Sequence, residues 1–300
     1  MIRSLIPRLG LVVLGALLPS GGATASELPV AGLDHVVVVV ADLEAAAARY
    51  RALGFALKPG RHHANGIRNL HAKFPDGTEI ELLTVDEPGD DLARSYRRHL
   101  AEGDGPAYAG FYGPDLEVTA GHLTSVDWPL RRAGGLLTID DPALGHVFFG
   151  RRNASPTDRP EHFAHANGAS GLQAVWWAAD DPSSDRLLDD LGARPVPVAW
   201  TSPSGAACRA ARLPSGEVRL LPPAERVRPD RPICGLTVAV ADLDAVLAAL
   251  QGVVPVEQVR VEGDGRAVLV APDAACGLWL EFRAVGGPGR PDRPETAGGR

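Results

Sequence analysis

The sequence predicts an α+β fold built from βαβββ modules, and three observations support this prediction. A β-branched run at 32–43 contains Asp42, a good helix N-cap, and leads into an alanine-rich stretch that stops at Gly54. The same order recurs near the C-terminus, from Gly235 to Gly252. The 34 glycines and 26 prolines indicate many turns and short elements, and argue against a long helical bundle.

The first module contains every element of the unit. After the helix expected at 44–53, strand-like segments follow at 55–58, 66–74 and 78–85, with a Pro75-Asp76-Gly77 turn between the last two. A right-handed crossover makes the first and second strands of a module parallel, and the following meander makes the fourth strand parallel to the first. Side chains of the first and fourth strands can then share one concave face.

Three further copies of this unit follow along the chain. In the fourth copy, the segment 277–282 matches 77–82 position for position, which aligns Glu281 with Glu81. The third copy begins at Gly171 and is expected to form a helix at 183–191 and a strand at 217–221. The second copy, at 106–150, is the most diverged, with strands expected at 107–112, 136–139 and 146–149 and a helix opening at Pro114-Asp115-Leu116.

The two ends of the chain are expected to lie outside the fold. Arg3 and Arg8 form a basic region before the apolar run 9–18, and Ala23-Thr24-Ala25 is typical of a signal-peptide cleavage site. We therefore expect residues 1–25 to be a signal peptide and the protein to be exported, either to the periplasm or as a secreted protein. An uncleaved membrane anchor is the alternative. The Gly/Pro/Arg-rich tail 286–300 is expected to be disordered.

Charge and motif content exclude several classes of function. A net charge of -7 leaves no broad basic surface, so a nucleic-acid partner is not expected. Lys58 and Lys73 are the only lysines, and neither belongs to a P-loop. The motifs of zincins, α/β-hydrolases and dinucleotide-binding proteins do not occur. No apolar run after the leader is long enough to span a membrane.

The three cysteines can form at most one intramolecular disulfide, which an exported protein could retain. Cys234 and Cys276 immediately precede Gly235 and Gly277, where the first and fourth strands of the last module begin. If those strands are parallel neighbours, both sulfurs lie at the same end. We therefore expect a Cys234–Cys276 disulfide and a free Cys208.

The first module resembles a known family. Its Gly32-Leu-Asp-His35 before a valine strand, its Leu53-Gly54-Phe55 at the helix end, and its run from Phe74 to Leu83 are similar to a glyoxalase-like domain. Such domains belong to the vicinal oxygen chelate superfamily, which includes glyoxalases, bleomycin resistance proteins and extradiol dioxygenases. The resemblance implies that βαβββ modules pair into two glyoxalase-like cups, at 31–168 and 171–285.

The resemblance also implies metal ligands on the first and fourth strands of a module, which are His35 and Glu81 here. Imidazole and carboxylate are suitable ligands for a divalent metal ion such as Fe, Mn, Ni or Zn. A metal with an open position could polarise a carbonyl or bind vicinal oxygens. In the second module the matching positions fall near Tyr108 and on Phe148 or Phe149, so the first cup inherits two ligands.

The second cup departs further from the family pattern. In the third module the matching positions hold Ala174 and Arg219, and in the fourth they hold Gly235 and Glu281. We therefore expect no metal in the second cup, and we expect a structural, buried ion pair between Arg219 and Glu281. The adjacent Trp176 and Trp177 are expected to serve core and cup-wall packing.

Other residues are candidates for completing the first cup. His146 opens a strand and is expected to share its inward face with Phe148, which would make it a third metal ligand. Arg68, Asn69 and His71 are the predicted substrate-binding residues. Less favoured candidates, taken from the loops and the connection between the cups, are Arg61, His62, His63, His162 and His165. All nine histidines occur at or before His165, which favours chemistry in the first cup.

The sequence thus predicts a metal-dependent protein that acts on a small oxygenated substrate by Lewis-acid activation, as a lyase, an isomerase or a dioxygenase. A non-catalytic protein that binds or sequesters a small molecule is the alternative from a different class. An Fe(II) extradiol dioxygenase is a second alternative, but it needs two histidines and a carboxylate, and only His35 is firmly placed among the histidines.

Overall fold

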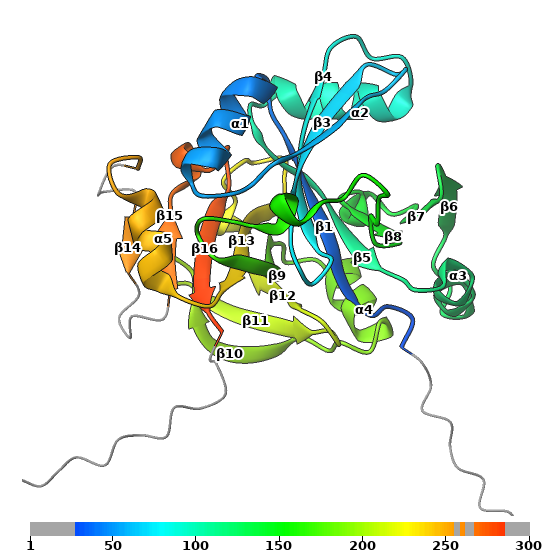
Figure 1. The fold of residues 1–300 in the computed structure, drawn as a ribbon. Coiled ribbons are helices and arrows are strands. Elements are labelled where there is room, and N and C mark those ends of the chain that lie inside the picture. The colour runs from blue at the N-terminus through cyan, green and yellow to red at the C-terminus, as the bar shows by residue number, and fades with distance from the viewer. Residues whose placement is uncertain (1–27, 255–258, 262–266, 286–300) are drawn as a thin grey trace, which may run out of the picture.

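The structure, a computed structural model, describes residues 28–254, 259–261 and 267–285. The predicted signal peptide and C-terminal tail lie outside these residues, so both remain predictions. No helix in the described ranges is long and apolar enough to cross a membrane. Figure 1 shows the chain forming two strand-rich halves, with helices at the periphery.

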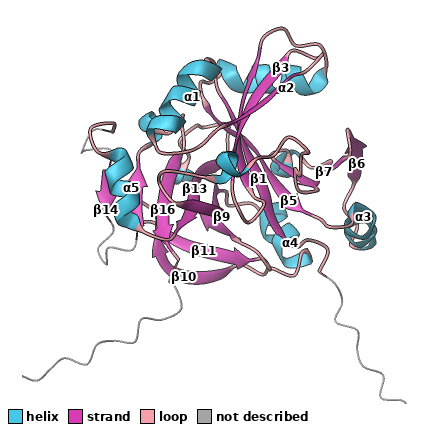
Figure 2. Ribbon diagram, in the orientation of Figure 1, coloured by secondary structure: helices cyan, strands magenta, loops and turns pink. Residues whose placement is uncertain are grey.

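The described chain forms two sheets of eight strands each, curled into cups (Figures 1 and 2). The first sheet has the order β2-β3-β4-β1-β5-β8-β7-β6, and the second has the order β10-β11-β12-β9-β13-β16-β15-β14. The strands of the first sheet are β1 (Gly32–Val39), β2 (Lys58–His62), β3 (Ile67–Lys73), β4 (Glu79–Val85), β5 (Gly105–Tyr112), β6 (Leu130–Ala133), β7 (Leu136–Ile139) and β8 (Val147–Gly150). Those of the second are β9 (Ala169–Ala178), β10 (Val196–Thr201), β11 (Ala207–Arg212), β12 (Glu217–Leu221), β13 (Ile233–Val240), β14 (Val259–Val261), β15 (Ala267–Val270) and β16 (Trp279–Ala284).

The predicted α+β fold of paired βαβββ modules is confirmed. The first and fourth strands of each module are parallel neighbours, namely β1 with β4, β5 with β8, β9 with β12, and β13 with β16. Modules pair through antiparallel contacts of β1 with β5 and of β9 with β13. The register also supports the alignment of the modules, because Glu81, Arg219 and Glu281 each lie opposite an equivalent residue of the first strand.

Each module contributes one helix, and an aspartate caps the N-terminus of all four. These helices are α1 (Leu43–Ala52), α3 (Leu116–Ser125), α4 (Pro182–Asp190) and α5 (Leu243–Leu250), preceded by Asp42, Asp115, Asp181 and Asp242. Each aspartate side chain accepts a backbone N–H of the first turn, which satisfies donors that the helix leaves free. The Asp-Leu pattern of the first, second and fourth modules is therefore a helix start, and Asp181-Pro182 takes its place in the third.

An additional helix, α2 (Asp91–Ala101), lies between the first two modules and was not expected from the sequence. Its Ala93 and Tyr96 pack with Val37, Val39 and other apolar residues of the first sheet. These strand residues lie on the concave side, so α2 fills one end of the first cup. Only the other end, which begins at His35, is left for an open site.

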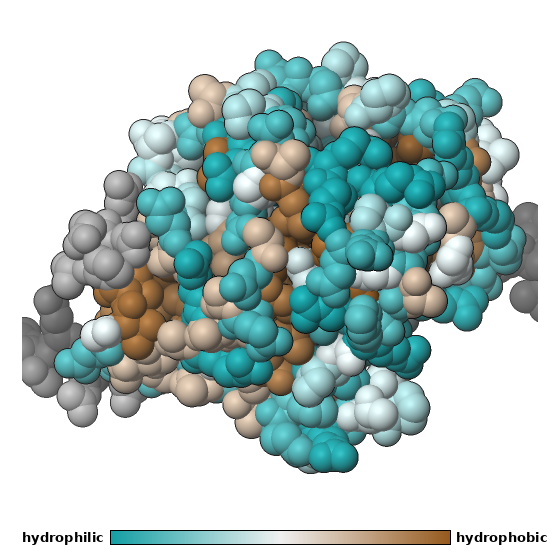
Figure 3. All heavy atoms as spheres, turned by 90° about the horizontal axis from the view of Figure 1, so that it is seen from above, coloured by the Kyte–Doolittle hydropathy of each residue, from teal (hydrophilic) through white to brown (hydrophobic). Residues whose placement is uncertain are grey.

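The main hydrophobic core lies between the two sheets and under the module helices. Phe111 of the first sheet meets Trp177 of the second, with ring centres 6.0 Å apart. Phe55, just after α1, stacks on Phe282 of β16 at 5.7 Å. Seen from above, the surface over α1 and α2 is mainly hydrophilic, and hydrophobic residues show in a band near its middle (Figure 3). The helices therefore cover the core with their apolar faces and present polar faces to solvent.

The second cup is filled by its own side chains. Trp176 and Trp200 form the centre of an apolar cluster on its concave side, with ring centres 4.6 Å apart. The predicted buried ion pair is confirmed, since Arg219 Nη1 lies 2.8 Å from Glu281 Oε2. Thr237 and Trp200 also donate hydrogen bonds to Glu281, so this carboxylate is well satisfied. Trp177 lies on the opposite face, in the main core, so both tryptophans have the expected packing roles.

The predicted Cys234–Cys276 disulfide is wrong. All three cysteines are buried and unpaired. Cys234 belongs to the cluster inside the second cup, whereas Cys276 belongs to the main core on the other side of the sheet. The strands are indeed parallel neighbours, but β16 begins only at Trp279, three residues after Cys276, and Cys276 has φ 54, so the alternation expected of a strand does not extend to it.

Candidate functional site

The candidate site begins at His35, in the middle of β1. Its Nδ1 lies 2.8 Å from Asp34 Oδ2, and its Nε2 lies 3.6 Å from Glu81 Oε2. The ring of Phe148 packs against it, with ring centres 4.8 Å apart. Burial acts to lower the pKa of His35, but the hydrogen bond to Asp34 and the charges of Glu81 and Glu79 together raise it to about 9. The imidazole is thus held at one nitrogen and faces the cup with the other.

Glu81 of β4 and Asn69 of β3 form the next part of the site. Asn69 Nδ2 donates a hydrogen bond of 2.6 Å to Glu81 Oε1, which leaves Oε2 towards His35. Three predicted site residues, His35, Asn69 and Glu81, therefore come together on one wall. The reason is strand alternation: residues 69 and 71 of β3 and residues 79 and 81 of β4 share the concave face.

Glu79 is a site residue that the sequence reasoning missed. It accepts two hydrogen bonds from Asn153 Nδ2, at 3.0 and 3.2 Å, and lies 3.1 Å from His71 Nδ1. Burial acts to raise its pKa, but His71, His35 and Asn153 together lower the pKa of Glu79 to about 2. The signal was available, because two carboxylates spaced by two residues on one strand must share a face.

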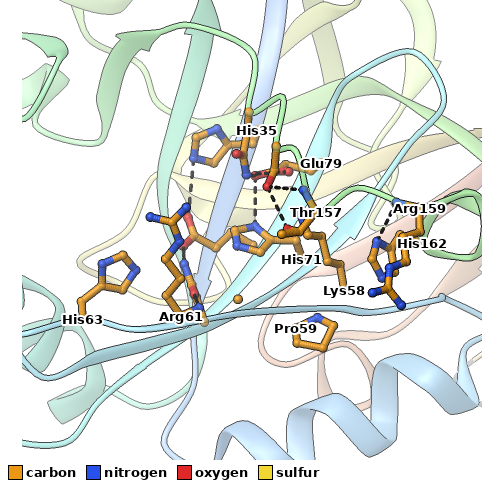
Figure 4. Close-up of a pocket in the computed structure, with 15 residues that line it drawn as sticks. His35, Lys58, Pro59, Arg61, His63, His71, Glu79, Thr157, Arg159 and His162 are labelled. Carbon is orange, nitrogen blue, oxygen red and sulfur yellow. Dashed lines mark hydrogen bonds and ion pairs between the residues drawn. The ribbon is translucent and has the colours of Figure 1, made fainter.

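These residues line an open cavity of about 720 Å³ (Figure 4). A cavity of this size suits a small-molecule ligand. His35 and Glu79 lie on one side of it, Pro59 and Arg61 on the opposite side, and Arg159 at the far end. The full lining is His35, Lys58, Pro59, Gly60, Arg61, His63, Asn69, His71, Glu79, Glu81, Asn153, Ser155, Thr157, Arg159 and His162.

The connection between the cups, residues 151–168, forms the remaining wall of the cavity. Asp158 in this segment contacts two buried ammonium groups, of Lys58 and of Lys73, and its Oδ2 lies 2.7 Å from Lys73 Nζ. Lys73 also donates to the carbonyl oxygen of Asn153. These contacts tie the segment to the edge of the first cup, and they bring His162 into the lining. His165 instead lies inside the core, where its Nε2 donates a hydrogen bond of 2.8 Å to the carbonyl oxygen of Lys73.

Arg68 does not lie in the cavity with Asn69 and His71, contrary to expectation. Its guanidinium makes two hydrogen bonds to Asp86, at 2.7 and 3.0 Å, on the outer face of the sheet. Because side chains alternate along a strand, Arg68 cannot share a face with its neighbour Asn69. Proximity along the chain is therefore not enough to predict that Arg68 binds the same ligand as Asn69 and His71.

His146 also does not join His35 and Glu81, so its predicted position is wrong. β8 begins only at Val147, and His146 follows the 3-10 turn η1 (Pro142–Leu144). Its ring packs edge-on against Trp177, with ring centres 4.8 Å apart. Trp177 belongs to the main core between the sheets, so His146 faces the core and not the cavity.

This position of His146 predicts a loss of stability in acid. Its Nε2 is buried without a hydrogen-bond partner among the described residues, and burial lowers the pKa of His146 to about 3. Below pH 6.5, the ordinary pKa of histidine, His146 therefore becomes protonated in the unfolded chain but stays neutral in the folded chain. Stability should fall as pH decreases from this value towards the folded pKa, by about 1.4 kcal/mol per pH unit.

The substitution His146→Phe keeps a ring against Trp177 and removes the titrating group. Urea unfolding of this variant should show a smaller loss of stability between about pH 6.5 and pH 4 than the wild type shows. His63→Phe, at an exposed histidine, is the matched control and should behave like the wild type. If His146→Phe and the wild type lose the same stability in acid, His146 is not the group that causes the loss.

The cavity wall carries donor atoms of the kinds that a divalent metal binds. His35 Nε2 and Glu81 Oε2 face each other, and Asp34 holds the second nitrogen of His35, as outer-shell carboxylates do for metal-bound histidines. Within the described ranges, no group of three or more His, Cys, Asp or Glu side chains is arranged to hold a metal ion. The described residues thus offer one converging pair of donors of the types that a divalent metal binds, an imidazole nitrogen and a carboxylate oxygen.

Comparison with known proteins agrees with this architecture. A family model described as a glyoxalase-like domain matches residues 33–191, more than half of the chain. The match includes the whole first sheet and continues through β9 and α4 of the second. A search of curated proteins finds no match.

Several solved structures share the fold at low sequence identity. A mutant of 4-hydroxymandelate synthase from Streptomyces coelicolor is 12% identical with a TM-score of 0.62, and the alignment covers 87% of this chain and 94% of that one. A variant of homoprotocatechuate 2,3-dioxygenase from B. fuscum is 13% identical with a TM-score of 0.59, covering 89% and 76%. A catechol 2,3-dioxygenase is 16% identical with a TM-score of 0.55, covering 88% and 96%.

Proposed function

The chain belongs to the glyoxalase-like domain family of the vicinal oxygen chelate superfamily, and from this premise we propose that its first cup is a metal-assisted site for a small oxygenated molecule. The reaction would be of the lyase, isomerase or dioxygenase type. We further propose, from the leader sequence alone, that the protein acts after export.

One observation carries the metal proposal. His35 Nε2 and Glu81 Oε2 lie 3.6 Å apart on the wall of the cavity, and each residue is oriented from behind by a hydrogen bond. Asp34 orients His35, and Asn69 orients Glu81. An imidazole nitrogen and a carboxylate oxygen that converge in this way are suitable ligands for Mn, Fe, Ni or Zn. When bound, the metal would supply Lewis-acid polarisation of a substrate oxygen.

The residues around this pair would bind and orient the substrate. Phe148 packs on the His35 ring and restricts its rotation. His71, oriented by Glu79, and Asn69 present polar groups on the same concave face. The segment that carries Asn153 forms one wall of the cavity. The second cup would not hold a metal, because Arg219 and Glu281 occupy its equivalent positions and pair with each other.

The second candidate function is non-catalytic binding of a small molecule. It is favoured by the lack of a donor group of three or more members among the residues that the structure describes. Catalytic metal sites in proteins usually have three protein ligands, so a pair holds a metal less tightly. Metal binding therefore separates the two candidates.

The test is calorimetric titration of the metal-stripped protein with Mn²⁺ and with Zn²⁺. We expect one site per chain, and His35→Ala and Glu81→Gln should each weaken binding by roughly 100-fold or more. Asp34→Asn should weaken it by about tenfold, because the second nitrogen of His35 loses its carboxylate partner. His62→Ala, an exposed histidine whose Nε2 lies 3.7 Å from Asp86 on the outer face, is the matched control and should bind like the wild type.

Two outcomes would contradict the assignment. If the metal binds equally well to the His35 and Glu81 variants, its ligands lie elsewhere. If no metal binds to the wild type, the non-catalytic candidate replaces the metal-assisted one.

A further inference from the structure

Arg61 extends from β2 into the cavity that His35 also lines (Figure 4). A regular β2 would direct residues 58, 60 and 62 to one face and residue 61 to the other. The pairing of β2 with β3 instead has a register shift between Pro59 and His62. After this bulge Arg61 and His63 line the cavity, while His62 turns outwards to Asp86. β-Bulges commonly redirect side chains in this way beside functional sites.

Asn69 fixes the position of this bulge. Its Oδ1 accepts a hydrogen bond of 2.8 Å from the backbone N–H of Arg61, while its Nδ2 donates to Glu81. At Gly60, a Cβ atom would lie 2.0 Å from Asn69 Oδ1 and 2.4 Å from the Asn69 carbonyl oxygen, so only glycine permits this close approach. One amide thus connects the backbone of Arg61 to the carboxylate of the proposed metal pair.

The charged side chains on the cavity wall differ in whether they have a partner within the protein. Lys58 is paired with Asp158, and Glu79 and Glu81 each accept hydrogen bonds from an asparagine. Arg159 lies 3.8 Å from Glu161, with both side chains exposed. The guanidinium of Arg61, in contrast, makes no hydrogen bond or ion pair with another residue of the described chain. The cavity therefore has an unpaired cation, which β2 contributes to the same lining as the proposed metal ligands.

We propose that the molecule bound in the first cup carries a carboxylate group, which Arg61 binds, while its other oxygens face His35 and Glu81. A guanidinium can bind a carboxylate through two parallel hydrogen bonds, which gives both affinity and orientation. This inference rests on the proposed function for the site, and it adds the substrate class, a small oxygenated carboxylate.

The test compares ligands that differ only in the proposed group. Catechol and 3,4-dihydroxybenzoate share the same vicinal oxygens, and only the second carries a carboxylate. Their dissociation constants are measured by calorimetry with the full-length protein, with and without Mn²⁺. The wild type should bind 3,4-dihydroxybenzoate about tenfold or more tightly than catechol, as expected for one charge-assisted contact.

Arg61→Gln should remove most of this preference, because it weakens the binding of 3,4-dihydroxybenzoate far more than that of catechol. Arg68→Gln is the matched control, since it removes the same charge from the outer face of the same sheet, where Arg68 contacts Asp86. It should keep the full preference. This control separates a direct contact of Arg61 from a general effect of net charge.

The outcomes distinguish this inference from the proposed function. Equal affinity of the wild type for the two ligands, or binding of neither, would overturn the carboxylate assignment. An equal loss of preference in the Arg61 and Arg68 variants would also overturn it. A preference that persists without Mn²⁺ and depends on Arg61, in a protein that binds no metal, would support the carboxylate site and refute the metal-assisted function.

Discussion

Replacing Arg219 by alanine is expected to lower the free energy of unfolding by about 3 kcal/mol or more, because it leaves a buried carboxylate without its main cation. Arg219 is 4% exposed and Glu281 is fully buried, and the two make a hydrogen bond of 2.8 Å. The guanidinium also lies over Trp200, 4.4 Å from the ring centre, so packing and a cation–π contact are lost as well.

Urea unfolding at neutral pH measures this loss. Arg131→Ala is the control, because Arg131 pairs with Asp140 at the surface, where such pairs contribute little. The double variant Arg219→Met with Glu281→Gln should be more stable than Arg219→Ala, since it removes the unpaired charge. A loss no greater than that of Arg131→Ala would show that the pair does not stabilise the second cup.

The same pair predicts a pH dependence. Burial acts to raise the pKa of Glu281, but Arg219 and Arg283 hold it below its ordinary value of 4.5. The pair therefore contributes its full stability above about pH 4.5, and the contribution is lost as the pH falls towards the lowered pKa. Arg219→Ala should lose less stability than the wild type over this range of acid.

Replacing Asp158 by asparagine is expected to have an effect of similar size, about 3 kcal/mol. Asp158 is the carboxylate that Lys58 and Lys73 share, and these lysines are only 6% and 3% exposed. Without it, Lys58 loses its ion-pair partner, and Lys73 retains the carbonyl oxygen of Asn153 and the more distant Glu79, at 4.0 Å. Because Asp158 belongs to the segment that covers the cavity, the loss should also loosen that wall.

Differential scanning calorimetry should record a decrease in Tm of roughly 6–12 °C, given about 2–4 °C per kcal/mol for a chain of this size. Asp86→Asn is the control with the same chemical change, at an exposed carboxylate that pairs with Arg68 on the outer face. Its Tm should change by only a few degrees. Equal effects of the two substitutions would mean that the two lysines do not depend on Asp158.

Much of the fold could be predicted from local patterns. The Asp-Leu helix starts, the glycines after the helices and the β-branched runs act over a few residues, so they identify each module without knowledge of the rest. Glu81 and Glu281 could be aligned because the modules repeat. The helix α2 was missed because it occurs once, between modules, and no repeat marks it.

The candidate site was only partly predictable for a different reason. Alternation along a strand is enough to place Asn69 with His71, and to exclude Arg68, if it is applied consistently. It fails at a strand end, as for His146, and at a bulge, as for Arg61. At these positions contacts with distant parts of the chain decide where a side chain points.

The sequence by itself determined the repeating module, the Arg219–Glu281 pair, and the two strands that carry His35 and Glu81, whereas the pairing of modules into two cups was implied by the resemblance to glyoxalase-like domains. Only the tertiary structure decided that α2 fills one end of the first cup and that residues 151–168 wall the other. It also placed Cys234 and Cys276 on opposite faces and directed Arg61 into the cavity. The physical reason is range: caps, turns and alternation depend on neighbouring residues, whereas burial, register shifts and shared ion pairs depend on segments that meet only after folding.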